Sequence, residues 1–264
     1  HTLFNVVPPL ILLPFGNYLA VLATKILPEK KEELGDVMHL EYIRPIETKR
    51  EHQIGNSAIA TNGIRSELSR MMEMAKENVD ASFRAVRSGN ADLLPEVEER
   101  EEYIDYLNKE ISKYISKVMV NETNPKDSQY ISALFKVCGN LERIGDHAMN
   151  ICEYTKMMEE RKISFSPAVA GEITEMQKVS NEAMEVLEKL GEYPEESMKK
   201  IEALEQQMDD MTENYRKAQI ERMQTGKCSD EACILYSEML TDFERIGDHI
   251  LNIGQEIGLG NVSE

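Results

Sequence analysis

The apolar residues of this chain recur at steps of three and four, which is the spacing of one face of an α-helix. One clear stripe consists of Leu134, Val137, Leu141, Ile144, Ala148 and Ile151. A second consists of Met198, Ile201, Leu204, Met208, Met211, Tyr215 and Ala218. No segment alternates with the period of two that a half-buried strand requires. The pattern therefore predicts an all-α protein.

Clusters of turn-forming residues divide this pattern into six long helices. The interruptions lie at residues 88–90, 121–125, 161–167, 191–194 and 225–227. At two of them a capping residue, Asn124 or Ser166, directly precedes a proline. Such a pair is typical of a helix start, because the cap satisfies a free amide and proline tolerates the first helical position. We therefore expect new helices to begin at these two points.

The first part of the chain has a different character. Residues 2–24 carry no charged side chain, and about 20 apolar residues are enough to cross a bilayer as a helix. Three prolines would kink such a helix, which is tolerated where neighbouring helices satisfy the backbone, and three lysines follow it. We expect residues 1–27 to be the end of a membrane domain and residues 28–56 to be a polar connector. The alternative is a buried segment of a soluble protein.

An internal repeat predicts the domain organisation. The hexapeptide ERIGDH at residues 142–147 recurs letter for letter at residues 244–249. A Glu-x-x-x-Asp pair likewise occurs at residues 101–105 and again at residues 205–209. Repetition at this distance indicates a tandem duplication of a three-helix unit. We expect two tandem three-helix bundles, repeat 1 over residues 57–162 and repeat 2 over residues 163–264.

The charge and the cysteines narrow the possible partners. The chain has 48 acidic and 30 basic residues, a net charge of −18, so it should repel nucleic acid and attract cations. It has four cysteines, which are Cys138, Cys152, Cys228 and Cys233. Because disulfides belong to oxidising compartments, we expect all four to be the reduced thiols of a cytosolic domain.

Eight carboxylates are candidate metal ligands. They are Glu101, Asp105, Glu142 and Asp146 in repeat 1, and Glu205, Asp209, Glu244 and Asp248 in repeat 2. Residues i and i+4 share one helix face, where two like charges destabilise the helix unless a cation compensates them. If the second and third helices of each repeat pack together, four carboxylates converge, and such oxygen ligands suit Mg, Ca, Mn or Fe. The alternative is a solvated acidic face that binds nothing.

The other residues of the hexapeptide have structural interpretations. Gly145 and Gly247 lower helix stability, so we expect them to permit a close approach of two helices. The two arginines either neutralise the acidic pairs or bind a partner. His147 and His249 follow the aspartates and are either outer-shell partners of these metal ligands or ordinary surface histidines.

Residues 141–151 and 243–253 resemble the signature helix of PhoU proteins, and the resemblance extends over about residues 57–258. It implies two three-helix repeats whose Glu and Asp pairs hold multinuclear metal clusters, most often of iron or zinc. The eight carboxylates named above would be the ligands. It also implies a regulator of phosphate uptake that contacts a transporter, its ATPase or a sensor kinase.

The first residues add a second resemblance. The sequence HTLFN at residues 1–5 and the apolar run after it are similar to the last membrane segment of bacterial Na/Pi cotransporters, which often carry a C-terminal PhoU domain. This implies the C-terminal part of such a transporter, with residues 1–27 in the cell membrane and residues 28–264 in the cytoplasm. Its partner would be its own upstream membrane domain, and a homo-oligomer is compatible with this arrangement.

Two other functions are alternatives to this one. The first is a stand-alone PhoU-type protein that represses phosphate uptake and starvation signalling through a sensor kinase, for which no membrane segment is needed. The second is a di-iron carboxylate enzyme, which uses Glu-x-x-His pairs. Glu142 and Glu244 are followed by glycine at the third position, so the sequence favours a protein that is not an enzyme.

Overall fold

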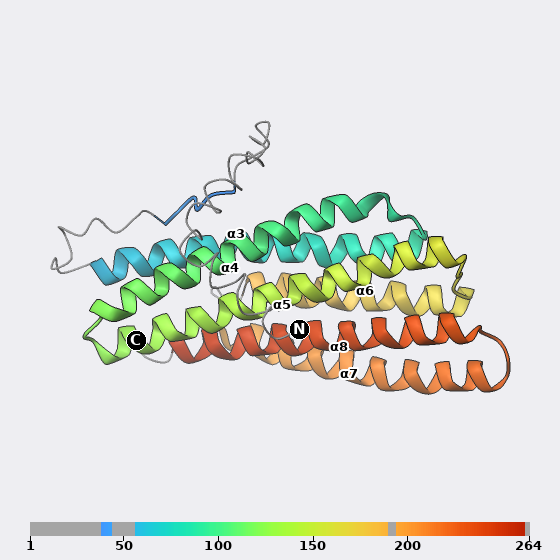
Figure 1. Ribbon diagram of the computed structural model, residues 1–264. Helices are drawn as coiled ribbons and strands as arrows, with labels where there is room; N and C mark the ends of the chain where they lie inside the picture. The colour runs from blue at the N-terminus through green and yellow to red at the C-terminus, as the bar shows by residue number, and fades with distance from the viewer. Residues whose placement is uncertain (1–37, 44–55, 190–193, 262–264) are drawn as a thin grey trace, which may run out of the picture. The chain divides into compact units, whose positions relative to one another are not determined.

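The computed structural model describes residues 38–43, 56–189 and 194–261 (Figure 1). This part of the chain is helical, as the sequence predicts. The long helices are α3 (Asn56–Ser88), α4 (Leu94–Asn121), α5 (Pro125–Arg161), α6 (Pro167–Glu188), α7 (Pro194–Gln224) and α8 (Asp230–Asn261). A short 3₁₀ helix, η2 (Ala91–Leu93), precedes α4.

The helix starts and turns follow the local chemistry of the sequence. The side chain of Asn124 accepts a hydrogen bond from the amide of Lys126 at the start of α5, and that of Ser166 accepts one from Val169 at the start of α6. Gly89 and Gly226 each have φ of 65°, a backbone conformation that glycine adopts without strain. The predicted helix starts are therefore confirmed within the described residues.

The six helices form two similar three-helix bundles. In repeat 1, α3, α4 and α5 all contact one another, and in repeat 2, α6, α7 and α8 do the same. The bundles join through α5 with α8, the most extensive helix pair, and through α3 with α6. The helices α4 and α7 therefore lie on the outer sides of the four joining helices.

One continuous apolar core runs through both repeats. It contains buried residues from all six helices, including the whole stripe predicted on α5. Phe83 of α3 and Phe243 of α8 are fully buried and meet edge to face, with ring centroids 6.3 Å apart. Because this contact joins the two repeats, the bundles share their core.

The membrane segment expected at residues 1–27 lies outside the described residues, as does most of the expected connector. Of the helices in the described part, none combines the length and the apolar character that crossing a bilayer requires. Within the connector, residues His39–Ile43 are described, and we call them the strap. The strap packs on the bundle, and the side chain of Ile43 joins the core.

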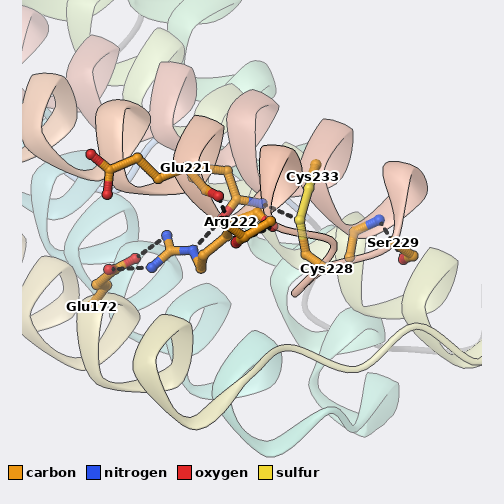
Figure 2. The surroundings of a disulfide bond; sticks show 9 residues. Glu172, Glu221, Arg222, Cys228, Ser229 and Cys233 are labelled. Carbon is orange, nitrogen blue, oxygen red and sulfur yellow. Dashed lines mark hydrogen bonds and ion pairs between the residues drawn. A yellow bond between two sulfur atoms is a disulfide. The ribbon is translucent and has the colours of Figure 1, made fainter.

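The prediction that all four cysteines are free thiols is wrong for one pair. Cys228 and Cys233 form a disulfide, with their Cα atoms 6.5 Å apart (Figure 2). The turn at Gly226 brings Cys228 back toward the first turn of α8, within the Cα separation that a disulfide requires. Cys138 and Cys152 are free, as expected, and both are buried.

Candidate metal centres

Repeat 1 brings three of its four predicted ligands together. Glu101 and Asp105 of α4 and Asp146 of α5 each offer a carboxylate oxygen, and these oxygens all lie within 4.8 Å of one another. We call this group centre 1. None of the three side chains is buried, so a cation could reach them from solvent.

Repeat 2 forms the equivalent group from the equivalent residues. Glu205 and Asp209 of α7 and Asp248 of α8 also have oxygens within 4.8 Å of one another, and we call them centre 2. Two clusters at matching positions of a duplicated unit are not expected of a randomly acidic surface. The convergence predicted for these six residues is therefore present in the structure.

Glycines set the spacing between the helices of each centre. A Cβ atom on Gly145 would lie 3.3 Å from Cδ1 of Ile104, and one on Gly247 would lie 3.2 Å from Sδ of Met208. The absence of a side chain lets α5 approach α4, and α8 approach α7, directly beside the acidic residues. The expectation that these glycines permit close helix approach is confirmed.

The carboxylates of centre 1 are electrostatically strained. Partial burial, and then the neighbouring Asp105 and Asp146, raise the pKa of Glu101 to about 7. Burial and neighbouring carboxylates also raise the pKa of Asp146 and of Glu142, which stands beside the centre without joining the group of three. No lysine or arginine in the described residues forms an ion pair with these four side chains.

One arginine pairs with centre 2, and a second pairs with the glutamate beside it. Arg245 forms an ion pair with Asp248 at 3.0 Å, and Arg216 forms one with Glu244 at 3.1 Å. Glu244 is therefore held by Arg216 and stands apart from the group of three. The position in repeat 1 that corresponds to Arg216 is Ser112, which carries no charge. Centre 1 is consequently the more strongly negative site.

The two histidines lie between the repeats. Nδ1 of His147 is 2.7 Å from Oδ1 of Asp242, and Nδ1 of His249 is 2.9 Å from Oδ1 of Asn140. The two rings are stacked with centroids 5.5 Å apart. Asn140 and Asp242 occupy corresponding positions of the two repeats, so the contacts are reciprocal.

Sequence reasoning did not find Asp242. Its side chain is buried, and it also accepts hydrogen bonds from Asn150 and from the hydroxyl of Tyr154. All three donors come from α5, so this carboxylate of α8 ties the two repeats together. Its signal in the sequence is a charged residue among apolar positions, directly before Phe243.

Comparisons with known proteins give one consistent result. A family model described as the PhoU domain matches residues 68–155 and 173–257. A PhoU homologue of the phosphate-specific transport system from Thermotoga maritima is 27% identical over 200 residues, which are 74% of this chain and 84% of the relative. A homologue from Zymomonas mobilis is 22% identical over 79% of this chain and 90% of the relative.

Solved structures share the fold. The crystal structure of PhoU from Pseudomonas aeruginosa aligns with a TM-score of 0.73 and 18% identity, over 78% of this chain and 99% of that one. PhoU from Streptococcus pneumoniae aligns with a TM-score of 0.67 and 17% identity, over 79% and 98%. At these identities the structures support the fold alone.

Proposed function

Because this chain belongs to the PhoU domain family, we propose that it regulates phosphate transport and binds metal ions at centres 1 and 2. The family match covers both repeats, and the named relatives are accessory proteins of phosphate transport systems. The observation that carries the metal proposal is the convergence of three carboxylates at the same place in each repeat. The role proposed here is binding and regulation rather than catalysis.

The donor set favours a hard cation. Both groups consist only of carboxylates, which are typical ligands of iron, manganese, magnesium and calcium. Zinc sites are more often built from cysteine sulfur and histidine nitrogen. Glu142 stands close enough to centre 1 to raise the negative potential there, and it is the natural fourth ligand of that centre. Centre 1 should hold metal more tightly, because Arg245 already neutralises part of the charge at centre 2 and Arg216 neutralises the adjacent Glu244.

The regulatory proposal predicts a change in phosphate uptake. In the native host, cells that carry the protein with residues 56–264 deleted should lose the normal dependence of uptake rate on external phosphate. Labelled phosphate uptake, measured at low and at high phosphate, checks this. Full-length protein with Asp146→Asn and Asp248→Asn tests separately whether metal is needed for regulation. An unchanged response in the deletion strain would contradict the proposed function.

The named relatives support a stand-alone accessory protein, and the sequence of residues 2–24 suggests a second form of this regulator, a domain fused to a sodium-dependent phosphate transporter. These residues carry no charge, although they lie outside the part that the structure describes. On this hypothesis the full-length protein stays in the membrane pellet after an alkaline wash, and phosphate uptake requires sodium. Release into the wash, with uptake independent of sodium, would favour a stand-alone accessory protein instead.

The raised pKa of Glu101 predicts a pH dependence of stability. A carboxyl whose pKa is higher in the folded than in the unfolded chain favours folding at low pH, and this contribution is lost as pH rises through the folded value. The melting temperature of the metal-free protein should therefore fall between about pH 4.5 and pH 7. Thermal melts in the presence of a chelator measure this, and Glu101→Gln should flatten the slope.

The control for this slope is a neighbour on the same helix. Glu99 is exposed and lies outside centre 1, and Glu99→Gln removes the same charge without removing any of the charges that raise the pKa of Glu101. It should leave the pH dependence as it is in the unaltered protein. An equal flattening by Glu99→Gln would show that overall charge, and not the centre, sets the slope.

A further inference from the structure

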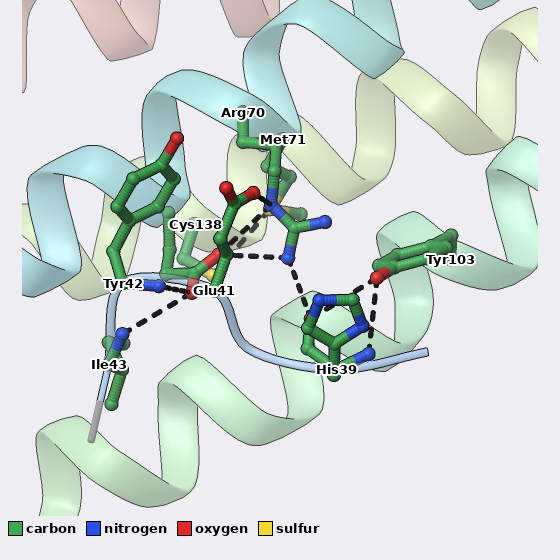
Figure 3. Close-up of polar contacts among 9 residues, drawn as sticks. His39, Glu41, Tyr42, Ile43, Arg70, Met71, Tyr103 and Cys138 are labelled. Carbon is green, nitrogen blue, oxygen red and sulfur yellow. Dashed lines mark hydrogen bonds and ion pairs between the residues drawn. The ribbon is translucent and has the colours of Figure 1, made fainter. Parts of the chain in front are cut away.

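The strap, residues His39–Ile43, is held by three side chains, Glu67, Arg70 and Tyr103, which we call the clasp (Figure 3). Glu67 of α3 is fully buried, and its Oε1 accepts hydrogen bonds from the backbone amides of Tyr42 at 2.6 Å and Ile43 at 3.4 Å. A buried carboxylate that receives two amides of a passing segment is a specific backbone-binding device, because an unpaired carboxylate there would be strongly destabilising.

The other end of the strap is held by two more side chains. Nη2 of Arg70 donates to the carbonyl oxygen of His39 at 2.8 Å and also binds Glu67 at 2.9 Å. The hydroxyl of Tyr103 accepts a hydrogen bond from the amide of His39 at 3.1 Å and donates to its carbonyl oxygen at 3.2 Å. Arg70 lies over the ring of Tyr103, 5.0 Å from its centroid, so the clasp is a connected unit.

Close packing completes the docking site. Ile43 is 7% exposed and joins the main core. A Cβ atom on Gly63 would lie 3.1 Å from the carbonyl oxygen of Tyr42, so the backbone of the strap runs directly over this glycine. Any larger residue at position 63 would push the strap away from α3. The PhoU family match begins at residue 68, so the strap, Gly63 and Glu67 all lie outside it.

The clasp is linked to centre 1 through one helix. Tyr103 lies on α4 between Glu101 and Asp105, which are two of the three residues of that centre. A cation that draws these carboxylates toward α5 would fix α4, and with it the hydroxyl that holds His39. Without a cation, the repulsion among these carboxylates opposes the packing of α4 against α5.

From this geometry we propose that the clasp reports the metal state of centre 1 to the chain that precedes the bundle. Metal binding tightens the hold on the strap, and metal loss weakens it. The inference rests on the proposed metal function. Since coupling between two sites is reciprocal, releasing the strap must weaken metal binding by the same factor.

Hydrogen exchange on the full-length protein tests the first half of the coupling, with Mn²⁺ added to metal-stripped protein as the probe. Exchange at the amides of Tyr42 and Ile43 should slow by about fivefold or more when Mn²⁺ binds, a change within the usual range of such couplings. Asp146→Asn should abolish this slowing. Exchange that is unchanged although Mn²⁺ is bound at centre 1 would overturn the inference.

The reciprocal half is tested by the affinity for Mn²⁺. Gly63→Val should weaken Mn²⁺ binding at centre 1 by the factor by which Mn²⁺ slows the exchange of the strap amides. Tyr103→Phe should also weaken Mn²⁺ binding, although it keeps the ring against Arg70. The matched control is Gly171→Val, because a Cβ atom on that helical glycine meets nothing within 4 Å. It should leave both the exchange and the affinity unchanged.

Elemental analysis separates the two ways of failing. If the protein binds no Mn²⁺, the proposed metal function fails and this inference fails with it. If Mn²⁺ binds and Gly63→Val exposes the strap amides without lowering the affinity, the metal function stands and only the coupling is wrong.

Discussion

Replacing Asp146 and Asp248 by asparagine is expected to remove most of the metal bound by the purified protein and to leave its helical content unchanged. Each aspartate is the single residue that its helix, α5 or α8, contributes to a group of three, so its loss leaves two carboxylates on one helix. Changing a residue that only hydrogen-bonds to a metal ligand can lower metal affinity by ~100-fold, so losing a direct ligand should lower it by at least as much. Elemental analysis and circular dichroism measure the two outcomes.

The matched control removes two charges from the same helices. Glu153 on α5 and Glu238 on α8 are exposed and lie outside both centres. Glu153→Gln with Glu238→Gln should keep the metal content of the unaltered protein. In the metal-free state the aspartate variant should melt at the same or a higher temperature than the unaltered protein, since fewer like charges repel. Full metal content in the aspartate variant would refute the centres.

Phe243→Ala is expected to lower the free energy of unfolding by about 3–5 kcal/mol, the usual effect of removing a fully buried aromatic ring. The ring lies against Phe83 of the other repeat, so the cavity opens in the core that both bundles share. Urea denaturation followed by circular dichroism should show one transition with its midpoint at a lower urea concentration, because the two repeats share the main core and should unfold together.

Phe135→Ala is the control for this loss. Its ring is on α5 and is 47% exposed, so its removal leaves little cavity and should change the free energy of unfolding by about 0.5 kcal/mol or less. Two separate transitions in Phe243→Ala, with one repeat unaffected, would contradict the shared core.

Much of this architecture could be predicted from local patterns. The apolar stripe from Leu134 to Ile151 and the caps at Asn124 and Ser166 need only the geometry of one helix, and the structure confirms them. The repeated hexapeptide places equivalent residues at equivalent positions. The grouping of six carboxylates needed one assumption, that the second and third helices of each repeat are neighbours.

What could not be predicted depends on contacts between distant residues. Glu244 has the same local pattern as Glu142, yet it pairs with Arg216 on another helix, 28 residues away. Nothing in the sequence around Arg216 indicates this partner. The buried role of Asp242 and the docking of Ile43 beside Gly63 are hidden for the same reason.

The reciprocal contacts of His147 and His249 have a consequence for the history of the chain. A contact that runs from the first half to the second, and equally from the second to the first, has the geometry of a two-fold symmetric dimer. In a dimer of identical subunits, one gene position specifies the histidine of both contacts and a second position specifies both of its partners. Joining the halves into one polypeptide lets the two copies of each position mutate independently, so the partner is the neutral Asn140 in one contact and the charged Asp242 in the other.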